Sequence, residues 1–310
     1  NTTTPIFSKE DNLKFFRTLN KRVNDYFKEN KINKTGNWKL HLKTIVMFGL
    51  FLTPYFFLLA KDMPFWVYLL LNVVIGIGMA GVGMNVMHDG NHGAYSTKSW
   101  VNKLMGGSIY ILAGNVYNWQ VQHNVLHHTY TNIIGHDEDL EAGRILRFSK
   151  TAKWYSHHRF QHYYSVFLYG LLTFNWAITT DFLQMKRYLK RQLSYGEAKS
   201  PAFQWTTLII TKTIYFSIWL VLPMILGITW WTVLLGFVVM HYTAGLILSV
   251  VFQLAHVVED TVNPMPDENG EIENTWAIHQ LFTTANFAPK NWIVNYYTGG
   301  LNHQIEHHIF

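Results

Sequence analysis

Residues 64–92, PFWVYLLLNVVIGIGMAGVGMNVMHDGNH, decide the fold, because a long uncharged apolar run ends directly in a pair of histidines. The run before His88 is long enough to cross about 30 Å of hydrocarbon as a helix. His88 and His92 stand four residues apart and therefore share one face of that helix. The stretch predicts a membrane helix that carries two neighbouring imidazoles where it leaves the bilayer.

The composition of the whole chain also indicates a membrane protein. Of its 310 residues, 49% are hydrophobic and 14% are charged, whereas soluble domains carry about 25% charged residues. Three further apolar runs have the length of a span, at residues 44–60, 205–227 and 230–255. Short connections near residues 61–63 and 227–229 join the spans in pairs. We therefore predict an all-α integral membrane fold with four transmembrane helices in two hairpins.

The distribution of lysine and arginine predicts the orientation of this fold. An even number of spans places residues 1–43, 88–204 and 256–310 on one side of the membrane. These segments hold ten, twelve and one of the 25 lysines and arginines. Because cytoplasmic loops are enriched in these residues, we expect this side to be cytoplasmic. The net charge of +6 is thus explained by topology, and no nucleic-acid partner is expected.

We expect a single membrane domain over residues 1–310, divided into five consecutive parts. These parts are an N-terminal amphipathic region (1–43), a first hairpin (44–87), a helical cytosolic cap (88–204), a second hairpin (205–255) and a C-terminal cytosolic part (256–310). Two shorter apolar stretches, residues 104–117 and 163–178, contain polar residues, and we interpret them as interfacial or re-entrant helices.

The N-terminal region has the pattern of an amphipathic helix. Apolar residues recur there at helical spacing among lysines, at Leu13, Phe16, Val23 and Phe27. A membrane-surface helix and a helix packed on the cytosolic cap explain this pattern equally well. In the second span, glycines are expected to allow close helix packing.

Histidines gather in three clusters on the predicted cytoplasmic side: HDGNH (88–92), HNVLHH (123–128) and QIEHH (304–308). His256 follows the fourth span directly, so it should emerge at the same membrane depth as the first cluster. On an α-helix, His123 and His127 share one face, and His128 points about 100° away, toward a second ion. His307 and His308, the last two residues of the third cluster, likewise point in two different directions.

These histidines predict a site for more than one metal ion. Eight imidazoles are too many for one tetrahedral zinc, and the first cluster lacks the glutamate of the HExxH zinc proteases. Two ions with about four or five ligands each fit better. No cysteine is present as a competing ligand, and imidazole suits Zn, Cu, Fe and Ni, so ligand type leaves the metal open. The predicted ligands are His88, His92, His123, His127, His128, His256, His307 and His308.

Other polar residues have two readings each. The run HHRFQH (157–162) imitates a ligand cluster, but its aromatic and basic neighbours favour a surface helix or a donor-docking patch. His241 lies within a span, where it could act in function or only pack as a neutral group. Lys212, also within a span, could snorkel or pair. Ordinary loop or cap roles are expected for His41, His136 and His279.

Acidic residues near the clusters could support the ligands. Metal-bound histidines usually donate their second ring N–H to a carboxylate or a carbonyl, which fixes the orientation of the ring. A solvated cytosolic face or helix caps would explain the same residues equally well. The candidates are Asp89, Asp137, Asp139, Glu259 and Glu306.

Three segments resemble the histidine boxes of the membrane fatty acid desaturases: HDGNH, WQVQHNVLHHTYTN (119–132) and GGLNHQIEHHIF (299–310). Their order, spacing and position relative to the spans agree over essentially the whole chain. The QIEHH form is similar to that of front-end desaturases and of bacterial acyl-CoA or acyl-lipid relatives. The resemblance implies four transmembrane helices under a helical cytosolic cap. It also implies a non-haem centre of two iron ions, which uses O2 to place a cis double bond in a long acyl chain of an acyl-CoA or acyl-lipid.

The resemblance further implies an electron donor of the cytochrome b5 or ferredoxin type, and it assigns residues. The seven box histidines fall on the ligand positions, and His256 matches an extra ligand after the fourth helix. Gln304 stands where other desaturases have a third-box histidine; its amide could ligate iron or support a ligand. His303 could substitute, because it is four residues before His307. Phe252 stands where some relatives have an asparagine, so no water-bridging ligand is expected there.

Two rival functions remain open at the level of the sequence. Related histidine-box enzymes are lipid hydroxylases, and one geometry can serve both outcomes, so only the product separates them. A metal transporter or a haem-binding membrane protein is the rival from another class. A transporter would need ligands near the middle of the membrane, where His241 is the one histidine within the predicted spans.

Overall fold

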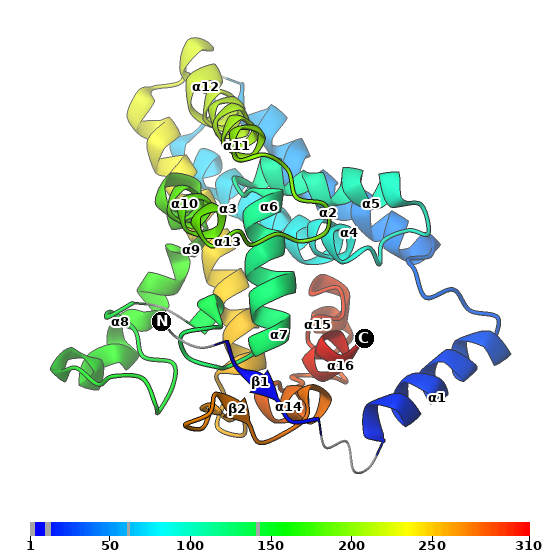
Figure 1. The fold of residues 1–310 in the computed structure, drawn as a ribbon. Helices are drawn as coiled ribbons and strands as arrows, with labels where there is room; N and C mark the ends of the chain where they lie inside the picture. Colours follow the sequence, from blue (N-terminus) through cyan, green and yellow to red (C-terminus); the bar gives the residue numbers. More distant parts are fainter. Residues whose placement is uncertain (1–3, 10–13, 61–62, 141–142) are drawn as a thin grey trace. The chain divides into compact units, whose positions relative to one another are not determined.

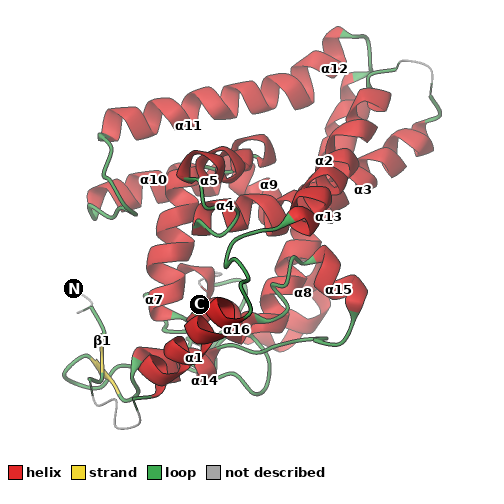
Figure 2. Ribbon diagram, turned by 90° about the vertical axis from the view of Figure 1, so that its right-hand side faces the viewer, coloured by secondary structure: helices red, strands yellow, loops and turns green. Residues whose placement is uncertain are grey.

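The computed structural model of the chain describes residues 4–9, 14–60, 63–140 and 143–310. Its ordered elements are almost all helical (Figure 2), which confirms the predicted all-α fold. Among the described residues, the one sheet pairs β1 (Ile6–Phe7) with β2 (Glu271–Ile272) in parallel. Figure 1 shows this small sheet next to α14 (Trp276–Thr283).

Four helical stretches are long and apolar enough to cross a membrane, as predicted. The first is α2 (Trp38–Leu58), and the second joins α3 (Phe65–Val82), the π-helix η1 (Gly83–Met87) and α4 (His88–His92). The third joins α11 (Pro201–Phe216), the π-helix η7 (Ser217–Val221) and α12 (Leu222–Ile225), and the fourth is α13 (Trp230–His256). The connection predicted near residues 61–63 includes 61–62, which lie outside the described residues.

Two spans begin earlier than their apolar runs, because polar residues cap them. The side chain of Asn37 accepts a hydrogen bond from the backbone N–H of Lys39 at 2.9 Å, and α2 starts next to it. Ser200 caps α11 in the same way, by accepting from the backbone N–H of Phe203 at 3.2 Å, and Pro201 fills the first helical position. Such caps satisfy backbone donors that the helix itself leaves unpaired.

The chain forms two compact units, each described here by itself. Unit 1 consists of Asn1–Gly36, Gln122–Gln161 and Val251–Phe310, and unit 2 consists of Asn37–Val121 and His162–Val250. The remaining elements of unit 1 are α1 (Phe15–Glu29), most of the π-helix η3 (Gln120–His127), α7 (His128–Tyr130), η4 (Glu138–Leu140), η5 (Ser156–Phe160), α15 (Trp292–Tyr297) and α16 (Gln304–Ile309). Those of unit 2 are α5 (Ser99–Gly106), η2 (Gly107–Leu112), α6 (Val116–Trp119), α8 (Gln161–Gly170), α9 (Leu172–Asn175), the π-helix η6 (Trp176–Thr180) and α10 (Asp181–Lys190). The five-part division of the chain stays a prediction.

Glycines let the spans of unit 2 approach closely. A Cβ atom added at Gly78 of α3 would lie 2.4 Å from the backbone nitrogen of Phe51 in α2. A Cβ atom added at Gly76 would lie 2.6 Å from the carbonyl oxygen of Met240 in α13. Backbone atoms cannot give way as a flexible side chain can, so both positions require glycine in this packing.

The two shorter apolar stretches form short helices, as expected. The first contributes to α5, η2 and α6, none of which has the length of a span. The second lies within Ser156–Gly170 and Leu172–Lys190, which are bent by 57° at their junction and form either a broken span or a re-entrant segment. Its interfacial or re-entrant character therefore stays a prediction.

A buried ion pair attaches these short helices to α11. Lys212 is 4% exposed, and its Nζ atom lies 2.8 Å from a carboxylate oxygen of Asp181. The same ammonium group donates to the carbonyl oxygens of Ala113 and, at 2.8 Å, Trp176. Asn118 donates to the other oxygen of Asp181 at 3.0 Å. Of the two readings of Lys212, the structure therefore supports pairing.

Helix α1 is amphipathic, and its first turn contacts another element of unit 1. The ring of Phe16 meets the ring of Trp276 in α14 edge to face, with centroids 5.6 Å apart. This contact favours a helix packed on other elements of unit 1 over one that lies free on the membrane surface. Leu13, part of the predicted pattern, lies outside the described residues.

Candidate metal centre

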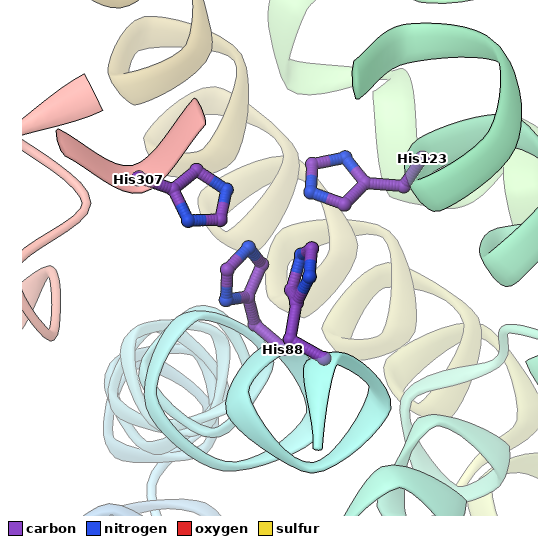
Figure 3. A group of neighbouring side chains, drawn as sticks. His88, His123 and His307 are labelled. Carbon is purple, nitrogen blue, oxygen red and sulfur yellow. The ribbon is translucent and has the colours of Figure 1, made fainter. Parts of the chain in front are cut away.

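The first histidine pair is placed by α4 of unit 2. His88 and His92 lie on one face of this helix, with ring centroids 4.5 Å apart, as the spacing of four residues predicts. Both rings meet the indole of Trp119 edge to face at 5.7 Å. The helix is held close to α5, because a Cβ atom at Gly90 would lie 2.3 Å from the backbone nitrogen of Gly106. Figure 3 shows His88 rising from this helix.

The second cluster lies on a π-helix, and this corrects the geometry expected from an α-helix. Gln120–His127 form the π-helix η3, in which backbone hydrogen bonds join residues five apart. The wider turn brings His123 and His128 together, so that their Nε2 atoms lie 3.2 Å apart. The expected α-helix is thus replaced by a π-helix, and the division of His127 and His128 between two ions stays a prediction. Short π-helical segments occur frequently at functional sites.

Three histidines meet in the interior of unit 1. His127 of η3, His256 at the end of α13 and His308 of α16 are all buried, and one ring nitrogen of each lies within 4.8 Å of the others. Nε2 of His127 and Nε2 of His308 have no hydrogen-bond partner among the described residues. A buried polar atom without a partner costs free energy. A metal ion that takes up these lone pairs would remove this cost.

Each of these three rings is held by an acceptor at its Nδ1 atom. The acceptor for His127 is the carboxylate of Asp137, with both oxygens at 3.1 Å. The acceptor for His256 is the carbonyl oxygen of Thr283, at 3.4 Å. The acceptor for His308 is the amide oxygen of Gln280, at 2.9 Å. This is the arrangement in which a metal-binding imidazole uses its second nitrogen to fix its orientation.

His123, His128 and His307 complete the group of histidines in unit 1. Ring nitrogens of His128, His307 and His308 also lie within 4.8 Å of one another. The rings of His123 and His307 are stacked with centroids 5.9 Å apart, and Figure 3 shows them facing each other. Unit 1 therefore brings together all of the predicted ligands except the pair on α4, which belongs to unit 2.

Two buried carboxyl groups set the electrostatics of this group. Burial alone would raise the pKa of Asp137, but His127 and the N–H of Asn132 outweigh it and hold that pKa below its usual range. Burial raises the pKa of Asp139 to about 6. Burial also lowers the pKa of His308 well below that of a free imidazole, so this ring is neutral at pH 7, as a metal ligand must be.

The other predicted supporting residues have different surroundings. Asp89 lies 3.4 Å from Nδ1 of its neighbour His88. Glu306 accepts a hydrogen bond from Asn286 at 2.8 Å on the surface, and Glu259 is exposed. The placement of Glu259 and Glu306 fits a solvated face, whereas Asp89, Asp137 and Asp139 lie beside ring nitrogens.

Gln304 and His303, the two alternative ligands of the third cluster, have different surroundings in the structure. His303 precedes α16, and its Nε2 atom lies 3.2 Å from the amide oxygen of Asn295, apart from the histidine group. Gln304 is buried at the start of α16, where its side chain hydrogen-bonds His256. These contacts favour a supporting role for Gln304 over ligation by either residue.

The histidines of the run HHRFQH contact neighbouring backbone and ring atoms. Both His157 and His158 use Nε2 to donate to the carbonyl oxygen of Arg144, at 2.7 and 3.0 Å. The ring of His162 contacts that of its neighbour Tyr163, tilted by 44° with ring centroids 3.9 Å apart. These contacts fit the surface role that the neighbouring residues favoured.

The sequence reasoning missed the contribution of α14. His279 was expected in a loop or a cap, but it is 1% exposed and its Nε2 atom donates to the carbonyl oxygen of Thr131 at 2.7 Å. Gln280 and Thr283 of the same helix were not singled out, although both hold histidine rings. One signal was present in the sequence, because a histidine and a glutamine interrupt an otherwise apolar helix, WAIHQLFT.

The described residues thus form a helical protein with four helices long and apolar enough to span a membrane and with clustered imidazoles. The sequence pattern of the fatty acid desaturase family matches residues 63–310. The chain is 38% identical to an sn-1 linoleoyl-lipid 6-desaturase of Arthrospira platensis, over 96% of this chain and 80% of that protein. It is 36% identical to an enzyme of the same name from Synechocystis sp., over 96% and 82%. It is 32% identical to an acyl-lipid (8-3)-desaturase of Physcomitrium patens, over 98% and 63%.

The chain belongs to the fatty acid desaturase family. It is a multi-pass membrane protein and an oxygen-dependent oxidoreductase that desaturates fatty acyl chains. The family, the class of enzyme and the reaction predicted from the sequence are thereby confirmed. Neither a lipid hydroxylase nor a transporter is among the relatives named here.

Proposed function

We propose that this desaturase acts on acyl chains esterified in lipids and introduces a cis double bond at carbon 6 of a linoleoyl chain. The proposal rests on its similarity to two sn-1 linoleoyl-lipid 6-desaturases over nearly the whole chain. The acyl-lipid form is favoured over acyl-CoA, because all three relatives described above carry a lipid in their names.

The proposed cofactor is a pair of iron ions bound by the eight histidines predicted from the sequence. Its support is the chemistry of the donor set. Imidazoles dominate it, two buried Nε2 atoms have no other partner among the described residues, and Nδ1 acceptors fix three of the rings. When bound, the iron pair supplies the O2 chemistry that breaks two C–H bonds on adjacent methylenes. Gln304 is proposed to support His256, and His303 is not proposed as a ligand.

The reaction balances with an external electron donor. The acyl chain gives up two hydrogen atoms, which are two protons and two electrons, and the donor supplies two more electrons. With two protons from solution, these reduce O2 to two molecules of water. We propose a donor of the cytochrome b5 or ferredoxin type and an active site on the cytoplasmic face, where the lysine and arginine distribution of the sequence places it.

Residues of the chain itself keep the site dry and oriented. The ring of Phe252 lies 5.4 Å from the ring of His127 and 4.8 Å from that of His256, measured between centroids. An aromatic ring at this position excludes water from the side where a polar residue would admit it. Asp137 orients His127, and the low pKa of His308 keeps that ring available as a neutral donor.

Expression in a host fed with linoleoyl lipids tests the proposal. Mass spectrometry of the lipids should show a new double bond at carbon 6, and the purified protein should carry about two irons per chain. The matched control is His127→Ala, which removes one proposed ligand and should abolish the product. An added oxygen in place of a double bond, or desaturation of acyl-CoA but not of lipid, would overturn the proposal.

A further inference from the structure

We propose that Gln280 is a positioning residue of this metal centre. Its amide oxygen accepts the Nδ1–H of His308 and so turns the Nε2 lone pair of that ring toward bound metal. The inference rests on the proposed function, because it assigns a role within the same site. It also adds a residue that lies outside the three histidine boxes.

The orientation of the Gln280 amide follows from its neighbours. Its nitrogen lies 3.2 Å from the carbonyl oxygen of His128, which can only accept a hydrogen bond. Its oxygen lies 2.8 Å from the hydroxyl of Thr131 and 2.9 Å from Nδ1 of His308. Exchanging the two amide atoms would set oxygen against oxygen at the carbonyl of His128. The amide therefore presents its oxygen to His308.

This orientation fixes the tautomer of His308. An amide oxygen can only accept, so the ring nitrogen that faces it must carry the hydrogen. The neutral ring then has its lone pair on Nε2, which is buried and has no hydrogen-bond partner among the described residues. The opposite tautomer would place two lone pairs against each other at 2.9 Å. Gln280 thus selects the form of His308 that can bind a metal.

Helix α14 holds the amide firmly in place. His279 of this helix donates to the carbonyl oxygen of Thr131 at 2.7 Å, and Trp276 donates to that of His128 at 3.0 Å. Gln280 itself is fully buried. The same helix also supplies the carbonyl oxygen of Thr283 that faces His256. Two of the three buried histidine rings therefore depend on α14, and one of those two contacts comes from a side chain.

A neutral acceptor suits this position. The carboxylate of Asp137 already contributes a negative charge beside His127. An amide at residue 280 fixes the ring of His308 without adding a second buried charge, which would need its own compensation. Burial favours the protonated form of a glutamate at this position. That form would keep both the acceptor for His308 and the donor for the carbonyl oxygen of His128, so it should preserve the orientation of the ring.

Three variants of the purified iron-loaded protein test the role of Gln280. Gln280→Met removes the acceptor at similar volume, and Gln280→Glu keeps it. Thr284→Val is the matched structural control. It deletes a buried hydrogen bond to the backbone carbonyl oxygen of Gln280, at 2.6 Å, and leaves the Gln280 amide and the histidine rings in place. Each variant is challenged with 2,2′-bipyridine, and the rate of iron release and the Mössbauer spectrum are recorded.

We expect Gln280→Met to release iron about 10–100-fold faster than the wild type, with an altered spectrum of one iron. Gln280→Glu and Thr284→Val should stay within about threefold of the wild type. If Gln280→Met does not fold, Gln280→Asn replaces it, because the shorter side chain withdraws the amide oxygen from His308. Equal release rates for Gln280→Met and Thr284→Val would overturn the proposal.

The outcomes for Gln280 and for the proposed function can be told apart. Wild-type protein that carries two irons and desaturates linoleoyl lipid supports the function whatever the variants do. If the wild type carries another metal, the proposed di-iron function is wrong. The release rates of that metal from the same variants then still test the positioning role of Gln280. Unchanged release from Gln280→Met in either case would contradict the positioning role.

Discussion

At the scale of single residues, Asp137 has the most constrained surroundings among the acidic groups near the histidines. Its two oxygens face Nδ1 of His127 at 3.1 Å, and they also accept from the backbone N–H groups of Asn132 at 2.9 Å and Asp139 at 3.0 Å. All of these partners are donors. The carboxylate therefore cannot be replaced by an amide without setting one donor against another.

Replacing this carboxylate should weaken the metal centre. We expect Asp137→Asn to lower iron occupancy and desaturase activity about 10–100-fold, because the ring of His127 loses its fixed orientation. Glu259→Gln is the control, because Glu259 is exposed. Iron content and product yield are measured for both variants. Full iron content in Asp137→Asn would contradict the role assigned to the carboxylate.

His279 predicts a pH dependence of stability. Burial lowers its pKa from 6.5 to about 4, so below pH 6.5 the unfolded chain takes up a proton that the folded chain does not. Stability should therefore fall as the pH drops from about 6.5 to about 4, by at most about 3 kcal/mol from this residue. His279→Gln can keep the hydrogen bond to Thr131 but cannot titrate. Its thermal unfolding in detergent should depend less on pH over this window; an unchanged dependence would refute the assignment.

The sequence identified ligands far better than it identified their supports. A histidine cluster is visible in the sequence because its members are close together, as in HNVLHH. Gln280 contacts a ring that is 28 positions away in the chain, so no local pattern links the two residues. Asp137 and Glu259 looked equivalent in the sequence, and only tertiary packing separates the buried carboxylate from the exposed one.

At the scale of elements, the close approach of α2 and α3 depends on the absence of a side chain at Gly78. Gly78→Ala should strongly destabilise the protein, because the added Cβ would lie 2.4 Å from a backbone atom of Phe51. Gly49→Ala is the matched control, because nothing lies within 4 Å of its added Cβ. It should be neutral or stabilise α2 by up to about 1 kcal/mol. Melting temperatures in detergent compare the two; equal values would contradict the packing argument.

The ion pair between Lys212 and Asp181 predicts strong coupling between α11 and α10. Removing one partner, as in Lys212→Met, leaves a buried charge and should cost about 3–5 kcal/mol. The double variant Lys212→Met with Asp181→Leu removes both charges and should be less destabilised than the sum of the single variants. A thermal-unfolding cycle measures this difference. Additive single and double effects would show that the pair does not interact.

Helices were predictable from the sequence where hydrophobicity alone determines their position. The four spans follow from apolar runs, and their ends differ from the prediction where caps such as Asn37 extend the helix. The π-helix η3 was not predictable, because QVQHNVLH holds only three apolar residues, too few to distinguish the period of a π-helix from that of an α-helix. Its register depends on contacts from distant elements, and it decides which of the histidines in HNVLHH meet.

At the scale of the whole molecule, the sidedness of the chain rests on its lysines and arginines, because the fold by itself does not tell one face of a bilayer from the other. With four spans and a re-entrant bent pair, as predicted, segments 1–43, 88–204 and 256–310 would lie on a common side. The charge asymmetry then predicts that this side is cytoplasmic. The predicted orientation would be reversed only if this asymmetry failed to direct insertion.

The absence of cysteine makes this orientation directly testable. Single cysteines are introduced at exposed positions, as Lys150→Cys and Glu268→Cys on the proposed cytoplasmic side and Thr229→Cys in the turn between the third and fourth spans. A membrane-impermeant maleimide added to intact cells should label only Thr229→Cys, because the bilayer shields the other two. After permeabilisation all three should react, which controls for accessibility. Labelling of Lys150→Cys in intact cells would place the histidine face on the opposite side and overturn the predicted topology.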